Sequence, residues 1–259
     1  MKLYFSGGEG TWDKVLLNAG VACRLKSYAE IADKANTRIR FPDIMLDSGA
    51  YSVDTGKSNI NIRTYTLWLE IYLSDYPQIK HYVVLDNIKS YQITRDNQEY
   101  MEAHGLHPMP VFHYGEPEEV LSKICSIHEY VGLGGVASNH LNTEKLRKWW
   151  EFVAETYKEN KFHLFAVGNM LPFVKYKPYS VDTTTWLSVR FGNLFCYKNG
   201  LPSSMCIPQN HDNDSNTTGN RVFFTWEELF NNNVRALLDF AKFEWTPKAQ
   251  QLDSTQLRF

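Results

Sequence analysis

Short apolar runs, each closed by glycine, proline, asparagine or aspartate, recur along this chain. Seven of them are KLYFSGG, DIMLDSG, HYVVLDN, MPVFHYG, YVGLGG, HLFAVGN and YSVDTTT, and a weaker eighth lies in NLFCYKNG or SSMCIPQ. Each run has the length of a strand and is apolar on both faces, which is typical of buried parallel strands rather than of half-exposed hairpins. The sheet that they form must therefore be covered on both sides.

Segments with helical spacing separate several of these runs. The segment NIRTYTLWLEIYLSDY, for example, brings Leu67, Ile71 and Tyr72 beside one another on a helix. The alternation of strand and helix over 259 residues predicts an α/β fold, a (β/α)8 TIM-type barrel formed by residues 1–259 as a single domain. An open doubly wound sheet is the alternative.

Two segments depart from this alternation. PQNHDNDSNTTGNR (208–221) is polar and predicts a long loop before a last helix, in which Thr225 and Glu228 have the spacing of a capping box. The tail from about residue 247 is polar and is expected to fray.

The charge balance and the apolar content limit the partners of the chain. Its formal net charge is −2, so any binding of nucleic acid must come from local basic patches. The first residues, MKLYFSGGEG, contain no apolar run of signal-peptide length, and no stretch approaches the roughly 20 apolar residues that span a bilayer. We therefore expect a soluble cytoplasmic protein with no membrane contact.

The cysteines predict reduced thiols. They lie far apart without a CxxC pair, at Cys23, Cys125, Cys196 and Cys206. A zinc site could be assembled from Cys125 with His128, or from the last two cysteines with His211, but these spacings are unlike those of compact structural zinc sites. We predict no zinc and no other cofactor.

Three of the apolar runs end on an aspartate, namely Asp47, Asp86 and Asp182. An ionised carboxylate is costly in a buried strand unless a specific interaction holds it, and the active site of a barrel lies at the carboxyl ends of its strands. We therefore expect the three side chains to share one site. An aspartate before Ser-Gly or Asn is also a common turn former or helix cap, which is the alternative.

Carboxylates on separate strands can do two kinds of chemistry. Two that face one cavity can act as nucleophile and general acid/base in a displacement at the anomeric carbon of a sugar. A third can accept hydrogen bonds from the N–H edge of a bound heterocycle.

Residues near the other strand ends allow two interpretations each. The turn GLGGVA, with Gly132, Gly134 and Gly135, either needs positive φ or lets backbone amides approach a ligand. His113 and Tyr114 after PVF are either packing residues or part of the site. The basic residues of EKLRKWW and of the later chain form either a solvated face or a track for phosphates; the later ones are Lys175, Lys177, Arg190 and Lys198.

In their order along the chain, these motifs resemble those of the tRNA-guanine transglycosylase superfamily. LDSGAYS is similar to the aspartate-Ser-Gly-Gly-Phe segment of that family, VVLDNI to its base-recognising strand, and GLGGVA to its Gly-Leu-Ala-Val-Gly turn. FAVGNM resembles its Met-Gly-Val-Gly strand, and YSVDTTTW resembles the strand that ends on its nucleophilic aspartate. The resemblance covers the chain from about residue 40 to 186.

The resemblance implies a guanine transglycosylase with a covalent aspartyl-glycosyl intermediate. Asp182 would attack C1′ of a guanosine unit, and Asp47 would handle the proton on the leaving guanine and then on the incoming base. Asp86 would bind the N1–H and amino edge of guanine, and the amides near Gly134 would meet its carbonyl oxygen. Further base-binding positions implied in this way are Ser48, Gly49, His113, Tyr114, Gly132, Leu133, Gly135 and Gly168.

The chain departs from the family pattern at several points. Members that modify tRNA carry a zinc site of three cysteines and a histidine after the nucleophile, and the later cysteines here do not match its spacing, so we expect no zinc subdomain. Ala137 stands where the family has a glutamate, and His113 or Tyr114 where it has a glutamine. Recognition of the group at the seventh position of the base is therefore open.

A compact chain of this kind resembles the DpdA-like branch of the superfamily, which includes bacteriophage members and exchanges guanine in DNA for 7-deazaguanine derivatives. The resemblance implies DNA as the preferred polymer, with tRNA as the alternative, and a free 7-deazaguanine base as the second substrate. A viral member would act in the host cytoplasm. A homodimer or an accessory protein is left open.

Two other functions fit the same residues. With water in place of the incoming base, two carboxylates would make an N-glycosidase or a glycoside hydrolase. A barrel that kept the base pocket without catalysis would be a DNA-binding or base-binding partner subunit.

Overall fold

The structure is a computed structural model, and it describes residues 1–8, 11–32, 41–136, 143–168, 171–173, 175–191, 193–198, 201–206 and 226–242. The chain divides into two compact units, one formed by Met1–Gly7 with Ala22–Thr183 and the other by Gly8–Val21 with Thr184–Phe259. The loop expected at 208–221, the tail from about residue 247 and Ala137 lie outside the described residues.

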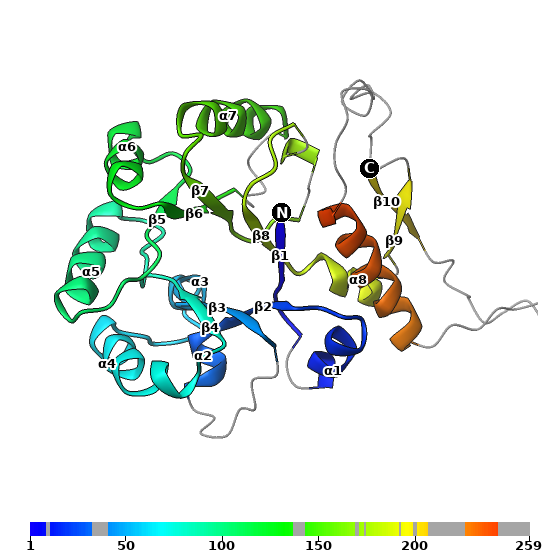
Figure 1. Cartoon of the computed structure of the whole chain (residues 1–259), viewed down its shortest axis with the longest axis horizontal. Helices are drawn as coiled ribbons and strands as arrows, with labels where there is room; N and C mark the ends of the chain where they lie inside the picture. Colours follow the sequence, from blue (N-terminus) through cyan, green and yellow to red (C-terminus); the bar gives the residue numbers. More distant parts are fainter. Residues whose placement is uncertain are drawn as a thin grey trace, which may run out of the picture. The chain divides into compact units, whose positions relative to one another are not determined.

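The first unit is built on eight strands: β1 (Lys2–Phe5), β2 (Cys23–Ser27), β3 (Asp43–Asp47), β4 (Ile79–Tyr82), β5 (Val111–His113), β6 (Tyr130–Gly134), β7 (Lys161–Leu164) and β8 (Ser180–Thr183). They pair in parallel in the order β4-β3-β2-β1-β8-β7-β6-β5. An isolated parallel bridge between Val83 and Met109 joins the two outer strands, so the sheet closes into a ring (Figure 1). The predicted α/β fold of the TIM-barrel type is confirmed.

Helices follow most strands of this unit: α2 (Tyr28–Ile31), α3 (Ala50–Asp54), α4 (Ile62–Tyr72), α5 (Tyr91–Ala103), α6 (Glu118–Ile127) and α7 (Thr143–Thr156), with short 3-10 turns η1 (Leu73–Asp75) and η2 (Leu171–Phe173). Side-chain caps start two of them, because Asn61 accepts a hydrogen bond from the amide of Thr64 and Ser90 one from the amide of Ile93. No described helix is long and apolar enough to cross a membrane.

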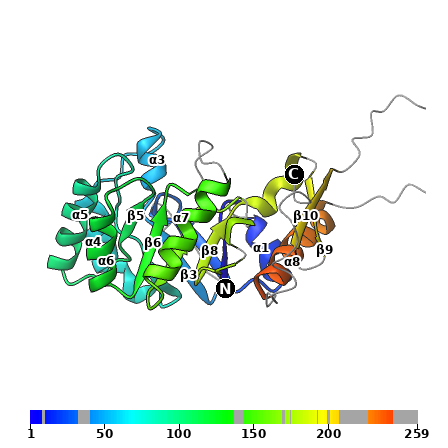
Figure 2. The same cartoon turned by 90° about the horizontal axis from the view of Figure 1, so that it is seen from above.

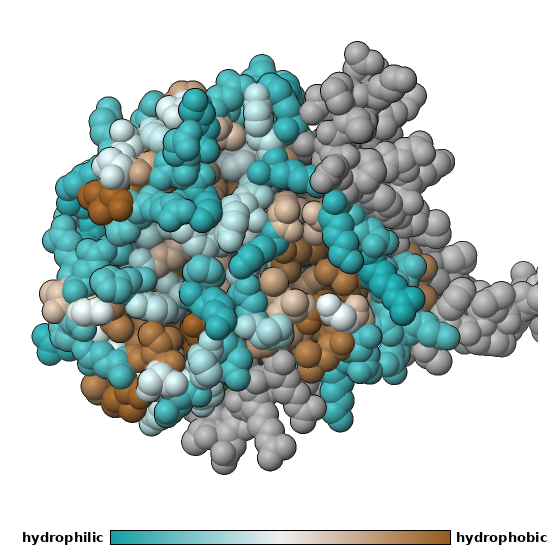
Figure 3. Space-filling view, viewed as in Figure 1, coloured by the Kyte–Doolittle hydropathy of each residue, from teal (hydrophilic) through white to brown (hydrophobic). Residues whose placement is uncertain are grey.

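Helix α4 turns a different face to the barrel from the one that its sequence suggested. Tyr65 and Leu69 are fully buried, and the Tyr65 hydroxyl donates to the carbonyl of Val83 at 2.8 Å. Leu67 and Ile71 are instead more than half exposed, and apolar side chains are visible on the surface over α4 (Figure 3). The helix was predicted correctly, but its apolar residues surround it, so their spacing did not identify the packed face.

Strand β2 is the element that the apolar pattern missed. Its sequence, CRLKS, alternates charged with other residues, yet Arg24 is fully buried and Lys26 is 5% exposed. The Arg24 guanidinium donates hydrogen bonds to the carbonyl oxygens of Phe5 and Gly7. A buried guanidinium that is paired with backbone oxygens is tolerated inside a fold, but a search for apolar runs does not find it.

The second unit contains α1 (Thr11–Asn18), η3 (Thr185–Phe191), β9 (Asn193–Lys198), β10 (Leu201–Cys206) and α8 (Trp226–Lys242). β9 and β10 pair with each other as an antiparallel hairpin. The expectation that one of these segments is the eighth barrel strand was therefore wrong, since β2 takes that place. The rings of Trp12 and Phe230 lie 4.3 Å apart, and both contact Trp186 edge to face.

The two ends of the barrel differ in what fills them. At the end where the strands begin, the Tyr4 hydroxyl donates to Asp43 Oδ1 at 2.9 Å and Lys2 Nζ pairs with Asp43 Oδ2 at 2.9 Å. Figure 2 shows α3 at the opposite end from the N-terminus, so the loops that follow the strands open there. Because the three aspartates follow strands, they belong to this second end.

Candidate active site at the carboxyl ends of the strands

The three aspartates lie at the same end of the barrel. Asp47 is the last residue of β3, Asp182 lies near the end of β8, and Asp86 lies in the loop after β4. Burial, together with the negative charges of Asp86 and Asp182, raises the pKa of Asp47 to about 7. Asp47 is therefore close enough to both other carboxyl groups to respond to their charges.

Asp47 is held by the turn that follows it. The amide of Gly49 donates to Asp47 Oδ2 at 3.1 Å, an interaction that by itself lowers the pKa of the carboxyl. Gly49 has φ of +85°, and a Cβ there would lie 2.8 Å from Ile60 Cδ1. The turn thus favours glycine for its backbone conformation, and a side chain there would also displace the end of Ile60.

Asp86 is the centre of a hydrogen-bonded cluster. Ser48 Oγ donates to Asp86 Oδ1 at 3.2 Å, and His113 Nε2 lies 2.9 Å from Asp86 Oδ2. The other ring nitrogen of His113 lies 3.2 Å from Glu116 Oε1. Burial alone would lower the pKa of His113, but its contacts with the two carboxylates raise it to about 9. At neutral pH the site therefore holds an imidazolium between two carboxylates.

Glycines at the end of β6 make room for that imidazole. A Cβ on Gly134 would overlap the His113 ring, and a Cβ on Gly132 would lie 2.6 Å from Phe165 Cε2. Gly135 has φ of +75°, and the amide of Tyr114 donates to the carbonyl of Gly134 at 3.0 Å. Positive φ at Gly135 agrees with the first interpretation of the turn, and the space beside Gly134 is filled by the His113 ring. The approach of its amides to a ligand stays a prediction.

Asp182 is held on one oxygen. The amide of Ala166 donates to Asp182 Oδ1 at 2.7 Å, and His163 Nε2 lies 3.4 Å from the same atom. Ala166 has φ of +55°, a left-handed conformation that is strained for a residue with a side chain. Neither residue was predicted from the sequence. The signal for His163 was a histidine in the otherwise apolar run HLFAVGN, and Ala166 gave no signal because alanine has no preference for positive φ.

The remaining residues singled out from the sequence are less closely tied to the aspartates. Leu133 is fully buried within β6. The ring of Tyr114 packs edge to face on Trp149 with centroids 5.1 Å apart. A Cβ on Gly168 would meet no atom within 4 Å, so space does not require glycine there.

The described basic residues on and near α7 support the interpretation that they form a solvated face. Arg147 pairs with Glu144 and Glu151 at 2.7 Å each, and Lys175 lies 3.6 Å from both Glu151 and Glu155. These cations are already matched by carboxylates on the surface. They therefore give no support to a phosphate track at this face.

No group of three or more histidine, cysteine or acidic residues among the described residues is arranged to hold a metal ion. Cys23 and Cys125 are free thiols. His211 lies outside the described residues, as do the side chains of Cys196 and Cys206. The absence of zinc stays a prediction.

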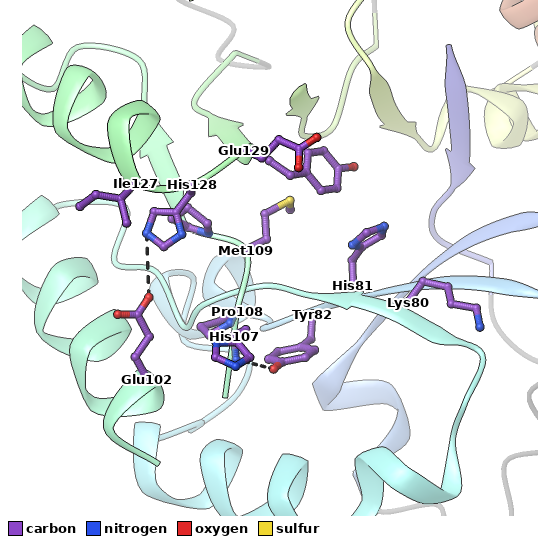
Figure 4. Close-up of a pocket in the computed structure, with 12 residues that line it drawn as sticks. Lys80, His81, Tyr82, Glu102, His107, Pro108, Met109, Ile127, His128 and Glu129 are labelled. Atoms are coloured by element: carbon purple, nitrogen blue, oxygen red, sulfur yellow. Dashed lines mark hydrogen bonds and ion pairs between the residues drawn. The ribbon is translucent and has the colours of Figure 1, made fainter. Parts of the chain in front are cut away.

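A cavity of about 300 Å³ lies at the opposite end of the barrel, where β5 and β6 begin. His81, Tyr82, Met109 and Tyr130 contribute to its wall, and His128 pairs with Glu102 at 3.9 Å on its rim (Figure 4). Because none of the three aspartates lines it, this cavity is separate from the candidate active site.

No protein-family model matches the chain, and no curated protein matches it. One solved structure that is similar comes from Aquifex aeolicus VF5, and its description is a structural study that states no activity. The two chains share 12% sequence identity with a TM-score of 0.41, over 71% of this chain and 83% of the other. The function therefore has to be argued from the site itself.

Proposed function

We propose that this protein is a guanine transglycosylase that exchanges guanine in a polynucleotide, preferably DNA, for a 7-deazaguanine base. The observation that carries the proposal is the presence of two carboxyl groups in different environments at one end of a barrel. Asp47 has a pKa of about 7, and Asp182 has one oxygen fixed by an amide at 2.7 Å. A nucleophile and a proton carrier that operates near neutral pH are what base exchange with a covalent intermediate requires.

In the first half of the reaction, Oδ2 of Asp182 would attack C1′ of the nucleotide. The C1′–N9 bond breaks, and its electron pair leaves with the guanine. The protonated carboxyl of Asp47 supplies a proton, so the base departs as neutral guanine and Asp47 becomes a carboxylate. The product is an ester between Asp182 and the sugar.

In the second half, the incoming 7-deazaguanine gives its N9 proton to Asp47, and N9 attacks C1′. The bond between C1′ and Asp182 breaks, which returns Asp182 to the carboxylate and Asp47 to the carboxyl form. A group that starts protonated and must be protonated again after each cycle works best when its pKa lies near the ambient pH. A pKa of about 7 for Asp47 supports this assignment.

The cluster around Asp86 supports the recognition of guanine. Each carboxylate oxygen accepts more than one hydrogen bond, so Asp86 can accept from N1–H and the amino group while it keeps Ser48 and His113. His113 lies against Gly134, where the carbonyl oxygen of the base would be met. Both N–H groups of the His113 ring are taken by Asp86 and Glu116, so the ring holds Asp86 in place and leaves that oxygen to the amides near Gly134.

The choice of polymer rests on the resemblance to the DpdA-like branch. Exposed aromatic and basic residues at the same barrel end support a bound single strand. Tyr51 on α3 is 66% exposed, with Lys57 Nζ 5.8 Å from its ring centroid. When one base is extruded from the stack, the adjacent bases become available to stack on exposed aromatic side chains such as that of Tyr51.

The test is mass spectrometry of nucleosides from plasmid DNA and from tRNA after expression in cells that make 7-deazaguanine precursors. We expect a deazaguanine nucleoside in DNA with the wild type and with Asp75→Ala, a matched change at an exposed aspartate of η1, and none with Asp182→Ala. Appearance only in tRNA would keep the reaction and change the polymer. Loss of guanine without insertion would indicate an N-glycosidase, and no change in either polymer would favour a binding subunit.

A further inference from the structure

Behind Asp182 lies a histidine that the proposed reaction has not yet used. His163 on β7 is fully buried, and its Nδ1 lies 2.7 Å from Ser180 Oγ. Ser180 Oγ in turn lies 2.5 Å from the hydroxyl of Tyr130. Among the described residues no acceptor forms a hydrogen bond with His163 Nε2, although Asp182 Oδ1 is only 3.4 Å away.

The His163 ring is fixed by its neighbours. Phe165 contacts it edge to face with centroids 4.6 Å apart, and Tyr4 contacts it in the same way at 5.7 Å. The ring therefore cannot turn away from Asp182 without disturbing two aromatic side chains of the barrel interior. A fully buried ring nitrogen without a partner is costly, so an interaction with Asp182 is the one that the packing favours.

Either hydroxyl can donate across the contact between Tyr130 and Ser180, and the direction in which Tyr130 donates fixes the hydrogen of the imidazole. Burial raises the pKa of Tyr130 well above its usual range, so its hydroxyl keeps its proton and can donate to Ser180. Ser180 then donates to Nδ1, and a neutral imidazole that accepts at Nδ1 carries its hydrogen on Nε2. That hydrogen faces Oδ1 of Asp182.

We propose that His163 is a positioning residue that holds Oδ1 of Asp182 together with the amide of Ala166, so that Oδ2 is the attacking atom. This inference rests on the proposed base exchange. Negative charge returns to the carboxylate of Asp182 each time its bond to C1′ breaks. Two donors on Oδ1 stabilise that charge as it returns in the second half-reaction, because they are already in place before the charge develops. In the first half-reaction they occupy Oδ1 and leave the attack to Oδ2.

The first test does not depend on activity. Nitrogen-15 spectra of the histidine rings are recorded at pH 8, with the His163 resonances assigned from their loss in His163→Gln. We expect hydrogen on Nε2, a shift of the Nε2 resonance in Asp182→Asn, and a change at Nδ1 in Ser180→Ala. Hydrogen on Nδ1, or an Nε2 resonance that does not move in Asp182→Asn, would overturn the proposal.

The second test measures base exchange under single-turnover conditions. We expect His163→Phe, which keeps a ring but no donor, to slow transfer from the Asp182 adduct to the incoming base by about 100-fold, the loss typical of one preorganised donor. KM for the free base should stay unchanged, since His163 does not face the base. His163→Gln retains an N–H at a similar place and should recover a large part of the rate.

The two tests separate the failure of this inference from the failure of the proposed function. If wild-type protein exchanges no base at all, the proposed function fails, and the spectra still decide whether His163 donates to Asp182. If exchange occurs and both His163 variants match the wild type, the positioning role is wrong. Circular dichroism of each variant excludes loss of folding as the cause of a slow rate.

Discussion

The amide of Ala166 donates a 2.7 Å hydrogen bond to Oδ1 of Asp182 from a backbone with φ of +55°. A left-handed conformation at a residue with a side chain costs about 1–2 kcal/mol. This strained conformation occurs in the turn whose N–H group points at Asp182, the candidate nucleophile. Strain that is concentrated at such a contact is typical of functional sites rather than of packing.

We therefore expect Ala166→Gly to raise the free energy of unfolding by about 1 kcal/mol, because glycine adopts positive φ without strain. Urea denaturation monitored by fluorescence measures the difference. Ala154→Gly in the interior of α7 is the matched control, and there the same substitution should destabilise by about 1 kcal/mol. Equal destabilisation by both substitutions would show that the Ala166 turn is not strained.

The pKa of Asp47 predicts how stability depends on pH. In the unfolded chain this carboxyl loses its proton near pH 3.8, and in the folded protein near pH 7. Between these values the folded state binds more protons, so its stability falls as the pH rises. Asp47→Asn removes this dependence and should be more stable than the wild type at pH 8, by an amount on the order of 2–4 kcal/mol.

Thermal unfolding from pH 4 to pH 8 measures that difference for the wild type and the variant. Asp75→Asn, an exposed aspartate on η1, is the control and should leave the pH dependence unchanged. Parallel curves for the wild type and Asp47→Asn would mean that the carboxyl titrates in its ordinary range. In single-turnover assays, the first half-reaction should slow above about pH 7, where Asp47 loses its proton.

The aspartates could be found from the sequence because each one interrupts an apolar run, and the rule for barrels assigns such strand ends to the active site. Their coupling could not be found in this way. The pKa of Asp47 depends on Asp86 and Asp182, which lie in or just after other strands and come near it only when the strands assemble into the sheet. His163 was missed for a similar reason, because Ser180 and Tyr130 are distant from it in sequence.

The fold was predicted from the alternation of strands and helices along the chain. The errors of this prediction arise at particular segments. β2 carries Arg24 and Lys26 in a buried strand, and the pairing of Arg24 with backbone oxygens has no signature in the sequence. The apolar residues of β9 and β10 suggested a barrel strand, but these segments pair with each other. An apolar run predicts that a strand forms and does not tell which sheet it joins.

The contacts of His113 predict a second effect of pH. Because the pKa of His113 is raised from 6.5 to about 9 in the folded protein, its contribution to stability is complete below pH 6.5 and is lost as the pH rises through 9. Glu116→Gln removes one of its two carboxylates and should lower this pKa. The variant should be less stable than the wild type at pH 6 and equally stable at pH 10.

A histidine titration by NMR and unfolding at the two pH values check this prediction. Glu119→Gln on α6 is the control, since Glu119 is exposed and the same charge is removed. An unchanged pKa of His113 in Glu116→Gln would show that Asp86 alone sets it.

Substitutions at Gly134 and Gly168 distinguish an effect on stability from an effect on base binding. In Gly134→Ala the new methyl group overlaps the His113 ring, so we expect a loss of about 1–3 kcal/mol in unfolding free energy together with loss of activity. In Gly168→Ala the methyl group meets no atom within 4 Å, so stability should be unchanged. If Gly168 approaches the base, as the family resemblance implies, Gly168→Ala will still weaken binding of the free base.

Tyr51 offers the most direct test of polynucleotide binding. Its side chain is 66% exposed, so Tyr51→Ala should leave the unfolding free energy unchanged within about 0.5 kcal/mol. If a base of the bound strand stacks on the ring, the same change should weaken binding of single-stranded DNA by about 1–3 kcal/mol, which fluorescence anisotropy can measure.

Tyr51→Phe keeps the stacking surface and should bind like the wild type. Phe152→Ala removes an aromatic ring of α7 that is 42% exposed, and it should not affect binding. Equal affinities for the wild type and Tyr51→Ala would place the strand elsewhere on the barrel.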